Sequence, residues 1–181
     1  GVDGTGTRLA EILKWPRLGL PVVFGMLPSE RSFTSAVWDE IGNRSFIFGG
    51  EDAIGQPLDE IVEFRDVVGV PVVQILLNAK LPSPRSATSA AFDGAYAYII
   101  GGRSSSVILS EIVRVNPNGD WEVGVQLMCP GIPGRLENST VAMSVDTISQ
   151  NSGIFMIGGR NETVERKEIW RYVPSYWDFG G

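Results

Sequence analysis

The chain has 181 residues, and its 43% hydrophobic and 20% charged content is ordinary for a globular protein. A net charge of −6, without any basic cluster, argues against nucleic acid or an anionic lipid surface as a partner. Histidine is absent, which removes the commonest general base and the commonest transition-metal ligand. The single cysteine, Cys129, excludes an internal disulfide framework and is expected to be a plain thiol.

The first predicted element is a strand at 8–15, RLAEILKW, in which a glutamate precedes alternating apolar residues. The same pattern returns at 58–64 (LDEIVEF), 109–115 (LSEIVRV) and 166–172 (RKEIWRY). The glutamates therefore form one column of a repeat of roughly 50 residues: Glu11, Glu60, Glu111 and Glu168.

A second pattern is a strand of small residues that we expect to open on an arginine, at 27–39 (LPSERSFTSAVWD), 81–93 (LPSPRSATSAAFD) and 132–146 (IPGRLENSTVAMSVD). The arginines form a column: Arg31, Arg85 and Arg135. Each strand is expected to end on an aspartate that opens a turn: Asp39, Asp93 and Asp146. In the middle copy, Asp93-Gly94 predicts a two-residue hairpin turn.

A third pattern is an apolar strand that ends in two glycines, at 45–50 (SFIFGG), 96–102 (YAYIIGG) and 154–159 (IFMIGG). A phosphate-binding loop is needed only once and is followed by a helix start, which is missing here. The glycines are therefore predicted to be architectural, ending a strand where the chain bends and backbones come close. They are Gly49, Gly50, Gly101, Gly102, Gly158 and Gly159.

Each unit thus reads as a strand after Arg, a turn, a strand closing on Gly-Gly, a polar loop, a strand opening on Glu and a fourth strand. The segment 19–31 (GLPVVFGMLPSER) also parallels 69–85 (GVPVVQILLNAKLPSPR), which supports the repeat without reference to any family. Such four-stranded antiparallel units typically stack around an axis as propeller blades.

These columns, with PSPRSATSA at 82–90 and EIVRVNPNGDW at 111–121, resemble kelch repeats over nearly the whole chain. The resemblance implies an all-β, kelch-type β-propeller, with the back half of a blade at 1–28 and blades at 29–79, 80–132 and 133–181. One column departs from the family, because many kelch repeats have histidine three residues after the arginine. Here it holds Thr34, Thr88 and Asn138, so nothing that needs that histidine is carried over.

About three and a half units fall short of the four to eight blades of a typical propeller. We therefore expect an open arc with apolar patches on its terminal blades. Further blades of the same chain would be needed to close the ring, or, as an alternative, a second copy.

Antiparallel order places the loops after the glycine pairs on one face of the arc. These loops, 51–58, 103–109 and 160–166, differ in charge and composition while the flanking strands agree, so we expect partner recognition there. The candidate partner-binding residues are Glu51, Asp52, Arg103, Ser104, Ser105, Arg160, Asn161 and Glu162.

The arginine and glutamate columns could form a ligand-binding ring of charge or a structural pair repeated in every unit. Repetition favours the structural pair, because a binding pocket needs distinct groups. We predict that Glu111 accepts hydrogen bonds from backbone or from a column arginine of its own or the next blade. Arg103 and Arg160 should be more exposed and less paired than Arg31 and Arg85.

The remaining side chains predict no catalytic set. Glu51-Asp52 and Asp59-Glu60 lack calcium-loop spacing, so neither a metal ion nor another cofactor is expected. Tyr96 and Tyr98 are expected to pack between blades. The tryptophans are expected to lie mostly in the core: Trp15, Trp38, Trp121, Trp170 and Trp177.

The function expected is a non-catalytic protein-interaction module. Kelch propellers are commonly interaction domains, in ubiquitin-ligase substrate adaptors, actin-associated proteins and extracellular proteins, so the resemblance implies a protein partner of unknown identity. The alternative is a carbohydrate-active or small-polar-substrate enzyme that uses Glu51, Arg103 and Arg160. A cytoplasmic location is slightly favoured, but the sequons at Asn43, Asn138 and Asn161 leave glycosylation and secretion open.

Overall fold

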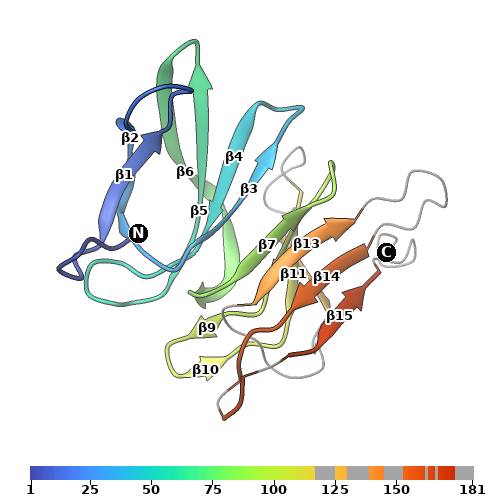
Figure 1. Cartoon of the computed structure of the whole chain (residues 1–181). Coiled ribbons are helices and arrows are strands. Elements are labelled where there is room, and N and C mark those ends of the chain that lie inside the picture. Colours follow the sequence, from blue (N-terminus) through green and yellow to red (C-terminus); the bar gives the residue numbers. More distant parts are fainter. Residues whose placement is uncertain (117–124, 130–138, 145–152, 162, 166, 174–181) are drawn as a thin grey trace.

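The computed structural model describes residues 1–116, 125–129, 139–144, 153–161, 163–165 and 167–173 (Figure 1). This part of the chain is all-β, with antiparallel strands and no helix. In particular, the described residues contain no helix of the length and apolarity needed to cross a membrane.

The strands form four successive sheets, none of which closes on itself. Sheet 1 pairs β1 (Leu9–Lys14) with β2 (Val22–Arg31). Sheet 2 has the order β3 (Ser35–Asp39), β4 (Arg44–Phe48), β5 (Leu58–Val67) and β6 (Val70–Arg85). Sheet 3 has the order β7 (Ser89–Phe92), β8 (Ala97–Ile100), β11 (Ile112–Val115) and β12 (Val125–Cys129), and sheet 4 contains β13 (Thr140–Ser144), β14 (Gly153–Ile157) and β15 (Ile169–Tyr172). A small hairpin, β9 (Arg103–Ser104) and β10 (Val107–Ile108), projects from sheet 3.

The predicted antiparallel meander of four strands is confirmed in sheets 2 and 3. The predicted strand start is wrong, however: Arg31 and Arg85 end β2 and β6, and the next strands begin only at Ser35 and Ser89. The residues in between cannot continue a strand, because Phe33 and Ala87 adopt positive φ angles of 54° and 53°. As a result β6 runs across the expected boundary between 79 and 80.

Sheets 2, 3 and 4 contact one another along their first strands, since β3 contacts β7 and β7 contacts β13, whereas sheet 1 contacts sheet 2 through β2 and β6 (Figure 1). The Ala87 N–H donates to the Phe33 carbonyl at 2.8 Å, and the hydroxyls of Ser35 and Thr88 lie 2.7 Å apart. Hydrogen bonds beside β3 and β7 therefore hold sheets 2 and 3 side by side.

Apolar side chains fill the spaces between the sheets. One cluster lies between sheets 2 and 3 and includes Phe46, Phe48, Ile61, Leu81, Ile99 and Val113. A second lies between sheets 3 and 4 and includes Tyr98, Ile100, Ile112, Ile154 and Met156, with Tyr96, Trp170 and Tyr172 packed against it. The prediction that Tyr96 and Tyr98 pack between units is confirmed. Burial, with the Asp93 carboxylate nearby, raises the pKa of the Tyr98 hydroxyl far above its ordinary value.

The expectation that the tryptophans lie mostly in the core is wrong for two of them. Trp15 is 75% exposed and Trp38 is 48% exposed. Trp38 lies on the outer side of β3, where Val37 and Asp39 point inward, because side chains alternate along a strand. Trp121 and Trp177 lie outside the described residues.

The predicted aspartate turns are present where the structure describes them. Asp39 ends β3, and its carboxylate accepts hydrogen bonds from the Gly42 N–H and the Arg44 guanidinium. Asp93 follows β7, and its N–H donates to the Tyr96 carbonyl at 3.1 Å. The central turn residues are therefore 94 and 95, one position later than predicted. Asp146 lies outside the described residues.

The column arginines and glutamates form ion pairs between consecutive sheets, as predicted for Glu111. Arg31, at the end of sheet 1, donates from Nη2 to Glu60 of sheet 2 at 2.8 Å. Arg85, at the end of sheet 2, makes the same bond to Glu111 at the start of β11. Both arginine side chains are completely buried. The pairing therefore favours the structural interpretation of the columns over a ligand-binding ring.

Each buried arginine is also held by the serine two residues before it. Arg31 donates to the carbonyl and hydroxyl oxygens of Ser29, and Arg85 donates to those of Ser83. One nitrogen, Nη1, has no hydrogen-bond partner in either arginine. The same local geometry is thus built twice from the same Ser-x-Arg sequence.

We predict that Arg85→Ala destabilises the protein far more than Arg103→Ala. Arg85 is buried, and its removal leaves the Glu111 carboxylate without its cation, a change that costs on the order of 3 kcal/mol. Arg103 lies in a partly exposed loop position, so its loss should cost below about 1 kcal/mol. Urea unfolding of the two variants measures the difference, and equal losses would contradict the structural role of the column.

A second prediction concerns pH. Burial opposes ionisation of Asp39, but hydrogen bonds from Gly42 and Arg44 outweigh it and hold the pKa of this carboxyl below its ordinary value. The stabilisation is therefore complete above about pH 4, the ordinary aspartate pKa, and is lost as the pH falls through the lower folded value. Asp39→Asn should be less stable than the native chain at neutral pH, and the gap should shrink in acid. Urea unfolding of both proteins across this pH range tests it; a constant gap would count against it.

Candidate functional site

The glycine pairs shape the loops that carry the candidate residues. All six glycines have positive φ, from 53° at Gly49 to 99° at Gly50. A Cβ on Gly50 would lie 2.7 Å from the Ser32 carbonyl oxygen, and one on Gly102 would lie 2.6 Å from that of Ser86. Only glycine satisfies both the backbone angle and this close approach, so the architectural interpretation of the pairs is supported.

Backbone hydrogen bonds of the glycine pairs fix the position of each loop. The first glycine of each pair donates to the carbonyl of the column glutamate, from Gly49 to Glu60, Gly101 to Glu111 and Gly158 to Glu168, at 2.9 to 3.1 Å. The residue after the first two pairs then forms a bridge with the residue after the column arginine, Glu51 with Ser32 and Arg103 with Ser86. Loops 51–57, 103–108 and 160–165 consequently lie at one edge of the sheets, the lower edge in Figure 1. We call this edge the loop edge.

Glu51 connects the loop edge to two neighbouring units. Its Oε2 lies 2.8 Å from Arg8 of sheet 1, and its Oε1 accepts from the Ser86 hydroxyl at 3.0 Å. Arg8 also donates to the Ser32 hydroxyl at 2.9 Å and to the Ala53 carbonyl at 3.3 Å. One carboxylate therefore links three successive units. Glu51, predicted as a partner-binding residue, thus also stabilises the contact between units.

Other candidates are held by local turns. The Asp52 carboxylate accepts from the N–H groups of Ile54 and Gln56, and the Asn161 side-chain oxygen accepts from those of Thr163 and Val164. Ser104 pairs with Val107 across the β9–β10 hairpin, in which Ser105 adopts a positive φ of 50°. The loop backbones are thus well defined by their own polar side chains.

The predicted contrast between the arginines is confirmed for exposure only. Arg31 and Arg85 are fully buried, whereas Arg103 is partly exposed and Arg160 is exposed. Arg103 and Arg160 each have an interaction partner, so the prediction that they are less paired than Arg31 and Arg85 stays a prediction. Three predicted residues, Arg135, Asn138 and Glu162, lie outside the described part of the chain.

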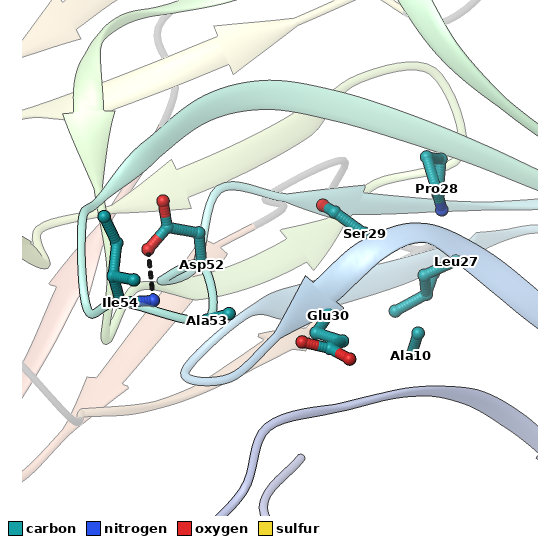
Figure 2. A pocket seen from close by; sticks show the side chains of 8 residues that line it. All are labelled: Ala10, Leu27, Pro28, Ser29, Glu30, Asp52, Ala53 and Ile54. Atoms are coloured by element: carbon teal, nitrogen blue, oxygen red, sulfur yellow. Dashed lines mark hydrogen bonds between the residues drawn. The ribbon is translucent and has the colours of Figure 1, made fainter.

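A cleft of about 550 Å³ opens between sheet 1 and the first loop (Figure 2). Residues Leu27 to Glu30 of β2 and Ala10 of β1 line one side, and Asp52, Ala53 and Ile54 line the other. Its wall is mostly apolar, with the carboxylates of Glu30 and Asp52 at its border. This cleft was not predicted from the sequence, because it depends on the contact between two units.

A smaller cleft of about 250 Å³ lies within the third loop, lined by Arg160, Asn161, Thr163, Val164 and Glu165. Neither of these two clefts brings Glu51, Arg103 and Arg160 together. Within the described residues, no group of three or more Asp, Glu or Cys side chains has metal-binding geometry.

The two described sequons differ in accessibility. Asn43 is exposed in the turn between β3 and β4, with a positive φ of 50°. Asn161 is partly buried within its loop.

The roles of Arg8, Ser32 and Ser86 were not predicted from the sequence. Arg8 stands three residues before the column glutamate, where the other units have Pro57, Ile108 and Glu165. A positive charge at this position occurs in one unit only, but its partner, Glu51, is 43 residues away. The two serines directly follow column arginines, and that shared position was the available signal.

A pair of glycine variants tests the architectural interpretation. Gly94 and Gly102 have nearly the same φ, 97° and 94°, but a Cβ on Gly94 meets open space, whereas one on Gly102 meets the Thr88 side chain at 2.5 Å. Gly94→Ala should cost about 1–2 kcal/mol for the backbone angle alone. Gly102→Ala should cost at least about 1 kcal/mol more because of the clash. Chemical unfolding of both variants gives the difference, and equal costs would refute the close approach.

The chain was also compared with known proteins. A scan against protein-family models gave no match, and no curated protein matches the sequence.

Proposed function

We propose that the chain is a non-catalytic protein-interaction module built on a kelch-type β-propeller scaffold, with the loop edge as its binding surface. The four-stranded antiparallel sheets, their contact through first strands and the repeated Ser-x-Arg to Glu pairs support this scaffold. Consecutive sheets then correspond to consecutive blades.

The observation that carries the proposal is the difference between framework and loops. The framework bonds of the glycine pairs recur from unit to unit, while the residues directly after them change from Glu51 to Arg103 to Arg160. A surface with constant spacing and varied chemistry suits recognition of an extended protein surface. The partner expected is a protein, in keeping with the net charge of −6 and the lack of a basic cluster.

The arrangement of charges favours binding over catalysis on this scaffold. Glu51 is neutralised by Arg8 at 2.8 Å, and it lies in neither of the two clefts described above. A sugar-processing site of the alternative kind would need Glu51, Arg103 and Arg160 around one substrate. Neither described cleft gathers these three side chains, which supports the binding module as the better proposal.

The test compares loop-edge variants with a variant at the opposite ends of the strands. Proteins captured by the immobilised chain are identified, and binding of each purified candidate is then measured by calorimetry. Arg160→Ala and Ser104→Ala should weaken binding of a true partner by about tenfold or more, because truncation of an interface hot spot costs about 2 kcal/mol or more.

The matched control is Glu40→Ala, which changes an exposed charge in the β3–β4 turn and should leave the affinity unchanged. The proposal is wrong if purified partners bind the loop-edge variants as tightly as the native chain. Turnover of a sugar that is abolished by Arg160→Ala would establish the enzyme instead.

A further inference from the structure

One face of sheet 1 is uncovered and apolar. Leu13 and Val23 pair across the two strands and are 58% and 59% exposed, and Met26, which pairs with Glu11, is 55% exposed. Trp15 directly follows β1. Cross-strand partners and residues two apart share a face of a sheet, so these five side chains form one surface. We call it the Glu11 face.

The equivalent faces of the next two sheets are covered. In β5, the side chains at 60, 62, 64 and 66 share a face. Phe64 packs edge-on against Phe24 of β2 at 6.1 Å, and Asp66 accepts from Lys14 at 3.0 Å. Val62, the counterpart of Leu13, is fully buried. Sheet 1 therefore covers this face of sheet 2.

Sheet 3 repeats the arrangement one unit later. Val113, two residues after the column glutamate, is fully buried in the cluster that contains Ala79 and Leu81 of β6. In sheet 4, Trp170 stands two residues after Glu168 and packs on the cluster of sheet 3. The face that begins with a column glutamate is thus always turned toward the preceding sheet.

The column glutamate on each of the covered faces of sheets 2 and 3 forms an ion pair with an arginine of the preceding sheet. Glu60 accepts from Arg31, and Glu111 accepts from Arg85, with each arginine supplied by a strand of the preceding sheet that ends in Ser-x-Arg. Glu11 occupies the same position, but it makes no hydrogen bond or salt bridge within the described part of the chain. The Gly1 ammonium lies nearby, and burial lowers its pKa while the Glu11 charge acts in the opposite direction.

We propose that the Glu11 face is a docking site for a β-sheet of the same repeat type, whose outer strand ends in Ser-x-Arg. The arginine would pair with Glu11, and the apolar residues before it would cover Leu13, Trp15, Val23 and Met26. Arg31 and Arg85, the two column arginines that the structure describes, are already bound to their own glutamates, so in a second copy they do not fit this role. This surface is distinct from the loop edge, and the proposal does not depend on what the loops bind.

The probe is a fluorescently labelled synthetic peptide, LLNAKLPSPR, which copies Leu76–Arg85 and contains the strand end that pairs with Glu111. We expect saturable binding to the full chain by anisotropy, with a change in Trp15 emission. Glu11→Gln in the protein, or citrulline in place of the peptide's arginine, should each weaken binding by at least about tenfold. Leu13→Ser should weaken it through lost apolar contact.

The control protein is Glu40→Gln, which alters an exposed glutamate away from this face and should bind like the native chain. All substituted positions are exposed, and matching unfolding curves would show that the variants fold. Absence of binding, or equal affinity for the native chain and Glu11→Gln, overturns the proposal. Sedimentation velocity supplies a further check: a dimer of the chain alone that is lost in Glu11→Gln would assign the face to a second copy and also overturn it.

Discussion

The ion pair between a buried arginine and the column glutamate of the next sheet is the contact on which this structure depends. An arginine with no exposed surface needs a partner, because an unpaired buried charge is strongly unfavourable. The partner is always in the next sheet, so forming the pair also fixes how consecutive sheets face each other. Ser29 and Ser83 hold the guanidinium in place, which makes the junction reproducible from one unit to the next.

The glycine pairs extend this constraint to the loop edge. Gly49 and Gly101 bond the backbone of the same glutamates whose side chains receive the arginines. A loop is therefore anchored directly beside the junction between two sheets, and its own residues are free to differ. Glu51 is an exception within this scheme, since it reaches Arg8 and Ser86 in the neighbouring units and so contributes to the junction itself.

The sequence predicted the all-β class, the antiparallel four-stranded units, the architectural glycines and the pairing of Glu111, because each depends on residue types that recur at fixed intervals. The predicted start of the next strand at Arg85 was wrong, because the chain leaves the strand conformation at Ala87. Alanine rarely adopts a positive φ, so the residue type does not predict this break. The candidate loops were located, but the roles of Arg8, Ser32 and Ser86 were not, because a hydrogen bond between positions 24 to 43 residues apart leaves no local pattern.

What the sequence alone determined is what repeats: the strand order, the presence of the aspartate turns and the chemistry of the columns, all set by local backbone preference and by side-chain period. What only the tertiary structure decided is which surfaces meet. Leu13 and Val62 stand at the same position of the repeat and are both aliphatic, yet one is 58% exposed and the other fully buried. Burial depends on whether a neighbouring sheet lies against the residue, and that is a property of the assembled fold.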